Sequence, residues 1–286
     1  MIQETGACDA TCVLKSINRV LRFFRRIHLS MTSIGSGIWF ENWKNSISSY
    51  DLVICIASRY SRNVLKWIKK HNSKCRCINY YWDSIEISEY PVHDDFSYEN
   101  WSFYKRDCEK YKMMYNPQFF LDNMLFPCRH KIYDVSYVGA DRNGKLKDRS
   151  NLVQKYYEIF ETIGVKTYFY YVTNDDTVNE NIKKERLIPE VEFYAICANS
   201  KAILDLVESK VNWLTFRPLL AIRNRIKVIT NNRAIINELF YTSKNIFILG
   251  IDDDDKLLDF INSDFVEIDE TKLAYYEFNT WLSRFG

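Results

Sequence analysis

The stretch SKAILDLVESKVNWLTFRPLLAIRNRIKVITNN, residues 200–232, contains two short apolar runs separated by a polar loop and a helical segment. The runs at 202–207 and 226–230 are typical of parallel strands that are buried on both faces. Residues 216–224 between them predict a helix, with Pro218 where a first helical turn tolerates proline. Strand, helix and strand in this order form a βαβ unit, which predicts an α/β fold.

The same alternation continues on both sides of this stretch. Towards the N-terminus, two apolar runs flank an amphipathic segment, which predicts strands at 51–58 and 76–83 around a helix over 62–70. The later half predicts strands at 133–139, 165–172, 202–207, 226–230 and 245–249, and helices over 151–164, 190–199, 216–224, 232–240 and 254–262. The sequence therefore predicts two Rossmann-like, doubly wound α/β domains.

The length of 286 residues also favours two domains, because a single core rarely grows beyond this size. We expect an N-terminal domain over 1–110 and an interdomain linker over 111–132. A second domain would follow over 133–265. Residues 266–286 would form a C-terminal helix that packs back on the N-terminal domain.

Composition excludes several classes of protein. A net charge of +2, from 39 basic and 37 acidic residues, gives no general attraction to nucleic acid. No strand is followed by the GxGxxG pattern of dinucleotide-dependent oxidoreductases. The eight cysteines and four histidines lack zinc-site spacing, and the N-terminus lacks the pattern of a secretory signal. We therefore expect reduced thiols, a cytoplasmic protein and no apolar run long enough to span a membrane.

Several blocks of the chain resemble a family of bacterial lipopolysaccharide and capsule glycosyltransferases. Residues 200–232 are similar to its donor-binding segment, in which an SK-aliphatic-LD strand precedes GLT-x-RP-x-EA and a strand ending in TNN. YDVSYVGADRNGKLKDR at 133–149 looks like its DVSFVG-x3-GR loop, and 103–120 looks like the stretch that joins its two domains. The counterparts in the donor-binding segment are Ser200, Lys201, Asp205, Leu214, Thr215, Arg217, Pro218, Thr230, Asn231 and Asn232.

This resemblance implies a GT-B-like fold, with two Rossmann-like domains facing a cleft. Residues 1–110 would form the acceptor-side domain and residues 133–265 the nucleotide-sugar donor-binding domain. It implies transfer of a sugar from a nucleotide-diphosphate-sugar co-substrate, with no cofactor, to a lipopolysaccharide, O-antigen or capsule oligosaccharide that is lipid-linked or part of a core. We expect no bound metal, because the acidic run at 252–255 is placed to begin a helix rather than to bind a metal ion. The expected donor-binding residues are Gly139, Arg142, Arg149, Lys201, Thr215 and Arg217.

The chemistry of these residues fits a diphosphate. Thr215 and Arg217 lie where a helix begins, and helix N-termini offer unpaired N–H groups and a favourable dipole to anions. Arg217 can donate two parallel hydrogen bonds to phosphate, although it could equally be an exposed loop arginine that contributes little to stability. Arg142, Lys145, Lys147 and Arg149 follow Gly139 in what could also be an ordinary solvated loop.

One departure from the family and one missing group leave the activity open. The family's glutamate after RP-x is Leu220 here, so that Glu208 or Glu238 would have to replace it, or activity would be reduced or lost. A non-catalytic GT-B-like protein that binds a sugar nucleotide or a partner is therefore the alternative. The candidate catalytic bases are His93 and Asp94, with Asp83 as another choice, although such residues commonly serve turns and caps.

The N-terminal region predicts an amphipathic helix near residues 13–28. Apolar residues (Val13, Ile17, Val20, Phe24) and basic residues (Lys15, Arg19, Arg22, Arg26) recur at helical spacing on different sides. The helix could attach the protein to the cytoplasmic face of the inner membrane, near a lipid-linked acceptor. It could also be a surface helix that packs on the first domain's sheet.

Overall fold

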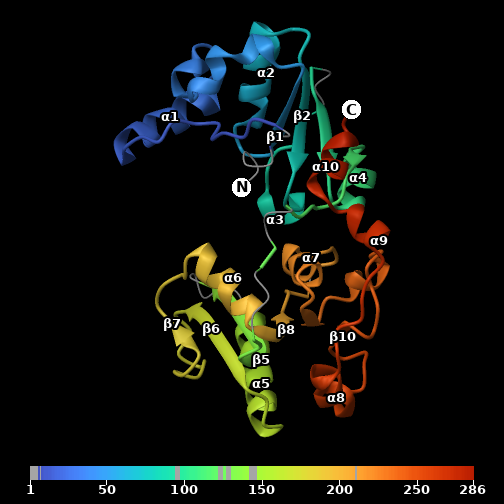
Figure 1. The fold of residues 1–286 in the computed structure, drawn as a ribbon. Coiled ribbons are helices and arrows are strands. Elements are labelled where there is room, and N and C mark those ends of the chain that lie inside the picture. Colours follow the sequence, from blue (N-terminus) through green and yellow to red (C-terminus); the bar gives the residue numbers. More distant parts are fainter. Residues whose placement is uncertain are drawn as a thin grey trace. The chain divides into compact units, whose positions relative to one another are not determined.

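The three-dimensional structure is a computed structural model in which the chain forms two compact units (Figure 1). The first unit comprises Met1–Gln118 and Trp281–Gly286, and the second comprises Phe119–Thr280. The structure describes the following residues, with Lys147 as main chain only: 6, 8–93, 97–121, 125–126, 130–141, 147–209 and 211–286.

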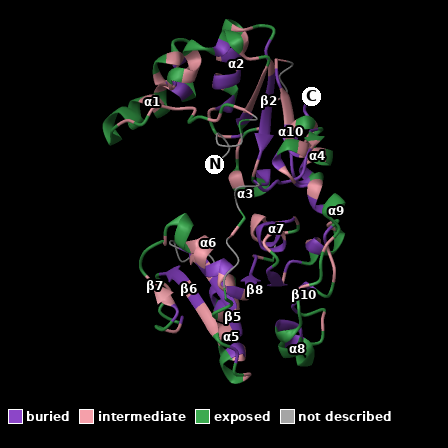
Figure 2. Cartoon of the chain, viewed as in Figure 1, coloured by how far each residue is buried: buried purple, intermediate pink, exposed green. Residues whose placement is uncertain are grey.

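The first unit is built on a four-stranded parallel sheet with the strand order β1-β2-β3-β4. Its register pairs Leu52 with Arg76 and Ile78 with Glu99. The bounds are Leu52–Ile56 (β1), Arg76–Tyr81 (β2), Glu99–Ser102 (β3) and Met114–Tyr115 (β4). Strand β2 is almost wholly buried (Figure 2), because side chains pack on both of its faces.

Helical segments cover both faces of this sheet. Helix α2 (Ser61–His71) packs Val64 and Leu65 into the same core as Cys77. Tyr80 points to the opposite face of β2, where its ring meets that of Trp281 at a centroid distance of 5.0 Å. The other elements are α1 (Arg19–Met31), η2 (Ser36–Trp39), η3 (Asn42–Asn45), η4 (Ile47–Ser49), α3 (Ile85–Ser88), α4 (Lys105–Tyr111) and α10 (Phe278–Ser283).

The second unit is built on a six-stranded parallel sheet with the order β10-β9-β8-β5-β6-β7. The first strand, β5, therefore pairs with both the second, β6, and the fourth, β8, and this arrangement is the Rossmann strand order. The bounds are Tyr133–Asp141 (β5), Thr167–Thr173 (β6), Lys183–Lys184 (β7), Ser200–Asp205 (β8), Lys227–Thr230 (β9) and Ile246–Ile248 (β10).

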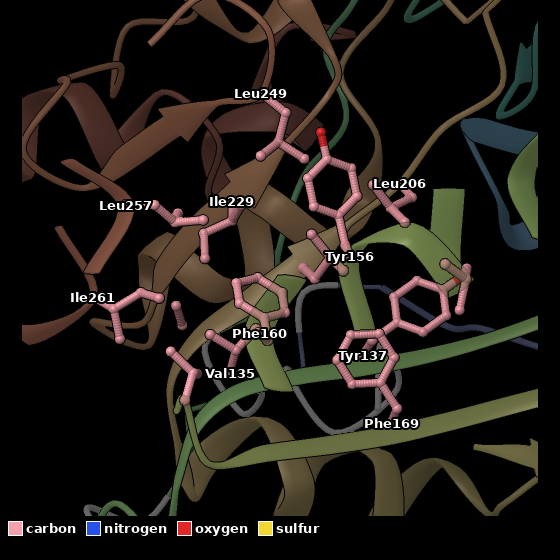
Figure 3. Close-up of a cluster of buried hydrophobic side chains, with 14 of the residues drawn as sticks. Val135, Tyr137, Tyr156, Phe160, Phe169, Leu206, Ile229, Leu249, Leu257 and Ile261 are labelled. Carbon is pink, nitrogen blue, oxygen red and sulfur yellow. The ribbon is translucent and has the colours of Figure 1, made fainter. Parts of the chain in front are cut away.

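Two apolar cores lie on the two faces of this sheet. Val135 and Tyr137 from β5 pack with residues of α5 and α8 in one core (Figure 3). Ile203 from β8 packs with residues of α6 and α7 in the other. The helical segments are α5 (Lys147–Thr162), α6 (Glu190–Ala198), α7 (Phe216–Arg223), η6 (Arg233–Asn237), η7 (Asp254–Lys256), α8 (Leu257–Asn262) and α9 (Glu270–Ala274).

The prediction of two α/β units, each built on a parallel sheet, is confirmed. Two local expectations need correction. Residues 233–237 form only a short 3-10 segment, which Asn232 caps by accepting a hydrogen bond from the Ala234 N–H. Helix α1 begins at Arg19 rather than near residue 13, because Asn18 caps it. Ahead of this helix, Leu14 forms an isolated antiparallel bridge with Phe40. Among the described residues, no helix is long and apolar enough to cross a membrane.

A buried lysine joins the second sheet to the end of helix α8. Lys227 begins β9, and its ammonium donates to the main-chain oxygens of Phe260, at 2.5 Å, and Ser263. It also donates to Ser263 Oγ at 2.6 Å. Because carbonyls at a helix C-terminus have no partner within the helix, this lysine replaces the water that they would otherwise bind.

We expect Lys227→Met to lower the free energy of unfolding by about 1–3 kcal/mol, because it leaves these buried oxygens unpaired while keeping most of the apolar stem. The matched control is Lys201→Met, which removes a half-exposed ion pair with Asp134 and should cost at most about 1 kcal/mol. Urea denaturation of both variants measures the difference. Equal losses would show that the buried ammonium adds nothing beyond an ordinary surface pair.

Candidate functional site

The strand order of the second unit indicates where a ligand would bind. In open α/β sheets, ligands bind outside the carboxyl ends of the strands, where the strand order changes direction. Here that point lies between β5 and β8. Strand β5 ends at Asp141, β8 ends at Asp205, and the next strand, β9, ends at Thr230.

Asp205 is the centre of a network at the end of β8. Its side chain is 1% exposed and lies 3.7 Å from Arg217 Nη1, measured from Oδ1. Its Oδ2 accepts hydrogen bonds from the hydroxyls of Thr215, at 3.0 Å, and Thr230, at 3.3 Å. The Thr230 hydroxyl also lies 2.8 Å from the Asp205 main-chain oxygen. One buried carboxylate therefore ties the start of α7 to the ends of two strands.

Two asparagines after β9 hold the loop that leads into α7. Asn231 accepts a hydrogen bond from Val207 N at 2.8 Å and donates to Val207 O at 2.9 Å. Asn232 donates to the main-chain oxygen of Trp213 at 2.8 Å. These contacts fix both ends of the loop between β8 and α7. Asn231 and Asn232 of the TNN block therefore stabilise this loop.

Arg217 is the second residue of helix α7, and its side chain is 31% exposed. Thr215 occupies the N-cap position, but its hydroxyl is used by Asp205 and makes no cap hydrogen bond to the helix. The helix N-terminus beside Arg217 therefore keeps its favourable interaction with an anion. The interpretation of Arg217 as a plain exposed loop arginine is wrong, because it pairs with a buried carboxylate.

A buried phenol lies in the middle of β5. Burial raises the pKa of Tyr137 to about 12, while the positive charges of Arg217 and Arg149 act in the opposite direction. Its hydroxyl has no hydrogen-bond partner among the described residues, and neither has the buried Nε of Arg149 in the first turn of α5. Two guanidinium groups thus act electrostatically on this hydroxyl. Buried hydroxyls without a hydrogen-bond partner are uncommon in folded proteins.

Gly139 has a structural reason to be glycine. A Cβ atom at this position would lie 2.4 Å from Tyr137 Oη, well inside a van der Waals contact. The tyrosine ring occupies the space above the glycine on the α5 face of the sheet. On this face of the sheet, the tyrosine side chain therefore lies against Gly139, where we expected a ligand.

The structure does not bring Lys201 together with Arg217. Lys201 lies near the start of β8, at the end of the strand opposite Asp205. Its ammonium pairs with Asp134 at 2.7 Å and donates to Asn262 at 3.2 Å. We therefore leave Lys201 out of the candidate site.

The remaining predicted residues fall in other places. Arg142 and Asp94 lie outside the described residues. His93 belongs to the first unit, where its main-chain oxygen accepts a hydrogen bond from Asn100 Nδ2 at 3.0 Å. Leu220 is buried in α7, and Glu238 accepts a hydrogen bond from the Tyr276 hydroxyl at 2.7 Å.

The sequence interpretation missed Tyr137, although a signal was available. The resembling family has phenylalanine at this position of its DVSFVG block, so that the hydroxyl is an addition in this chain.

The cavity lined by Ser136, Cys197 and Arg217 measures about 10 Å³, room for about one water molecule. This cavity is therefore too small to hold a nucleotide.

No acidic cluster able to hold a metal is present in the part of the chain that the structure describes. In the run at 252–255, Asp252 accepts a hydrogen bond from Ile248 N at 2.6 Å. Asp253 caps the following 3-10 segment by accepting from Asp255 N at 3.2 Å. The observed role of these two acids is to terminate and begin local structure.

Comparison with known proteins supports the fold but not a family. No family model matches the sequence, and no curated protein matches it. The chain is similar in structure to a sucrose-phosphate synthase from Thermosynechococcus elongatus, with a TM-score of 0.51, 9% identity, and coverage of 85% of this chain and 74% of that one. A Glycosylation Associate Protein (Gap123) complex from Streptococcus agalactiae gives a TM-score of 0.42 and 12% identity, over 92% of this chain and 53% of that one. The first likeness confirms the GT-B-like α/β fold with its two parallel sheets.

Proposed function

We propose that the protein is a glycosyltransferase whose second unit binds a nucleotide-diphosphate-sugar donor. The observation that carries this proposal is that Asp205 holds Arg217 at the N-terminus of α7, at the sheet edge where the strand order changes direction, while Arg149 and Arg217 both act electrostatically on Tyr137. Two guanidinium groups and a helix N-terminus are the groups that a diphosphate requires. The fold shared with a sucrose-phosphate synthase supports the proposal.

In this reaction an acceptor hydroxyl oxygen bonds to the anomeric carbon of the donor sugar. The bond from that carbon to the diphosphate oxygen breaks, and the nucleoside diphosphate leaves with its electron pair. The hydroxyl proton passes to a base, for which His93 and Asp94 remain our candidates. Arg217, held by Asp205, would stabilise the negative charge that grows on the leaving group without having to reorient.

The finer parts of the proposal rest on the sequence blocks alone. We propose as acceptor a lipid-linked or core oligosaccharide of a lipopolysaccharide, O-antigen or capsule, and a place at the cytoplasmic face of the inner membrane. The alternative is a protein that binds a sugar nucleotide without turnover, which the buried Leu220 favours. Release of the nucleoside diphosphate from a bound sugar nucleotide would distinguish an enzyme from a binding protein.

We expect Arg217→Ala to weaken nucleotide-diphosphate binding about 10- to 150-fold, the loss of one charge-assisted contact. Arg217→Lys should restore binding only in part, because an ammonium cannot make paired hydrogen bonds. Calorimetric titration with UDP, GDP and dTDP measures both variants, after thermal shift has identified the nucleotide that the parent binds.

The matched control is Lys201→Met, which also removes one positive charge. Lys201 lies near the start of β8, at the opposite end from Asp205, and pairs with Asp134. The variant should leave nucleotide affinity unchanged. Arg217→Ala should also destabilise the fold, because it leaves the Asp205 carboxylate buried without its ion pair. If the parent binds a nucleotide and Arg217→Ala binds it equally well, the donor site lies elsewhere.

We expect Tyr137→Phe to separate binding from stability. The variant loses a buried hydroxyl that has no partner among the described residues, so the free energy of unfolding should stay constant or rise. If a donor phosphate satisfies this hydroxyl, affinity should fall about two- to tenfold, the value of a neutral hydrogen bond. Loss of stability with unchanged affinity would assign the hydroxyl to the core alone.

We expect sugar transfer to persist in EDTA, because guanidinium groups and a helix N-terminus would supply the positive charge that a metal provides in other sites. The measurement is the rate of nucleoside diphosphate release with and without chelator. Activity that disappears in EDTA and returns with Mn²⁺ would contradict metal independence.

A further inference from the structure

Helix α1 is attached to the first unit along one side only. Leu29 is buried, and its main-chain oxygen accepts a hydrogen bond from Asn63 of α2 at 2.5 Å. His28 lies 2.8 Å from both Trp39 Nε1 and the Ile34 main-chain oxygen through its two ring nitrogens. Arg25 donates to the Lys15 main-chain oxygen at 2.8 Å. These three residues cover one arc of the helix, so the opposite side is turned away from the unit.

Most of α1 is exposed (Figure 2), and the side opposite these contacts is apolar. Val20, Phe23, Phe24, Ile27 and Met31, which we call the apolar stripe, fall within an arc of about 100° at 3.6 residues per turn. Phe23 is 60% exposed, Phe24 55% and Met31 80%. An ordinary surface helix turns its apolar side towards the core. Packing of an apolar side on the first sheet is therefore not what holds α1 in place.

Basic residues flank the apolar stripe. Arg19, Arg22 and Arg26 fall within an arc of about 60° beside it, and all three are exposed. The sequence from 10 to 40 contains five basic residues and no acidic residue. A second copy of the same helix would bring these arginines together, which like charges oppose. An anionic surface with an apolar interior complements both features.

We propose that α1 lies in the interface of an anionic lipid membrane, with the apolar stripe turned towards the acyl chains and the three arginines among the headgroups. Aromatic and aliphatic residues of interfacial helices enter the boundary between headgroups and acyl chains, and long basic side chains extend back to the phosphates. Asn63, Trp39 and Lys15 keep the helix attached to the protein on its other side. This surface is independent of the nucleotide site.

The test is flotation of the full chain with lipid vesicles. The parent should float with vesicles that mix phosphatidylglycerol and phosphatidylcholine, and far less with phosphatidylcholine alone. Phe23→Ser with Phe24→Ser should lower partitioning at least about tenfold for each phenylalanine. Arg19→Gln, Arg22→Gln and Arg26→Gln together should lower it on the order of a hundredfold on the anionic vesicles, with less effect as salt rises.

The control is Val191→Ser, which changes another exposed apolar residue in α6 of the second unit and should leave partitioning unchanged. Circular dichroism and nucleotide binding verify that each variant is folded. A parent that does not float with anionic vesicles overturns the proposal. So does a parent that is dimeric by light scattering and becomes monomeric with Phe23→Ser and Phe24→Ser, because the stripe would then be a contact between copies.

Discussion

The buried carboxylate of Asp205 is the constraint on which the candidate site depends. A charge at this depth is tolerated only if it is paired, and Arg217, Thr215 and Thr230 provide that pairing. Each of these partners comes from a different position: the first turn of α7, its N-cap, and the end of β9. The need to satisfy one carboxylate therefore sets where α7 begins and which side chain stands at its N-terminus.

The architecture could be predicted from the sequence because parallel strands buried on both faces are continuous apolar runs. The runs at 51–58 and 133–139 became β1 and β5 with small shifts at their ends. Shorter strands were missed. Glu99–Ser102 and Met114–Tyr115 are too short to show a period. The first becomes a strand by pairing with β2, and the second by pairing with β3. The last six residues complete the first unit's core, where Phe285 packs against Trp101.

For the site, the sequence could group residues that lie close together along the chain. It could not show which residues the sheet brings together and which it keeps apart. Arg217 and Thr215 could be grouped because a strand, a loop and a helix start follow one another in the sequence. Lys201 was grouped with them, although it lies near the start of β8 and Asp205 lies at its end. The extended backbone of a strand keeps residues at its two ends far apart. Tyr137 was missed because its relation to Arg149 and Arg217 exists only after β5, α5 and α7 have assembled.

Two features that conflict with stability in the isolated protein lie in the two places for which we propose a function. Buried polar groups normally find partners, yet the Tyr137 hydroxyl and the Arg149 Nε have none among the described residues. Large apolar side chains are normally covered, yet Phe23 and Phe24 stand on the surface beside arginines. Replacing the phenol by phenylalanine, or the two aromatic residues by polar ones, would remove these conflicts at little structural cost. Sequences commonly break the rules of stability at functional sites, because a ligand or a surface then supplies the missing contact. An anion that accepts from the first pair of groups and a bilayer that covers the second would each remove one conflict.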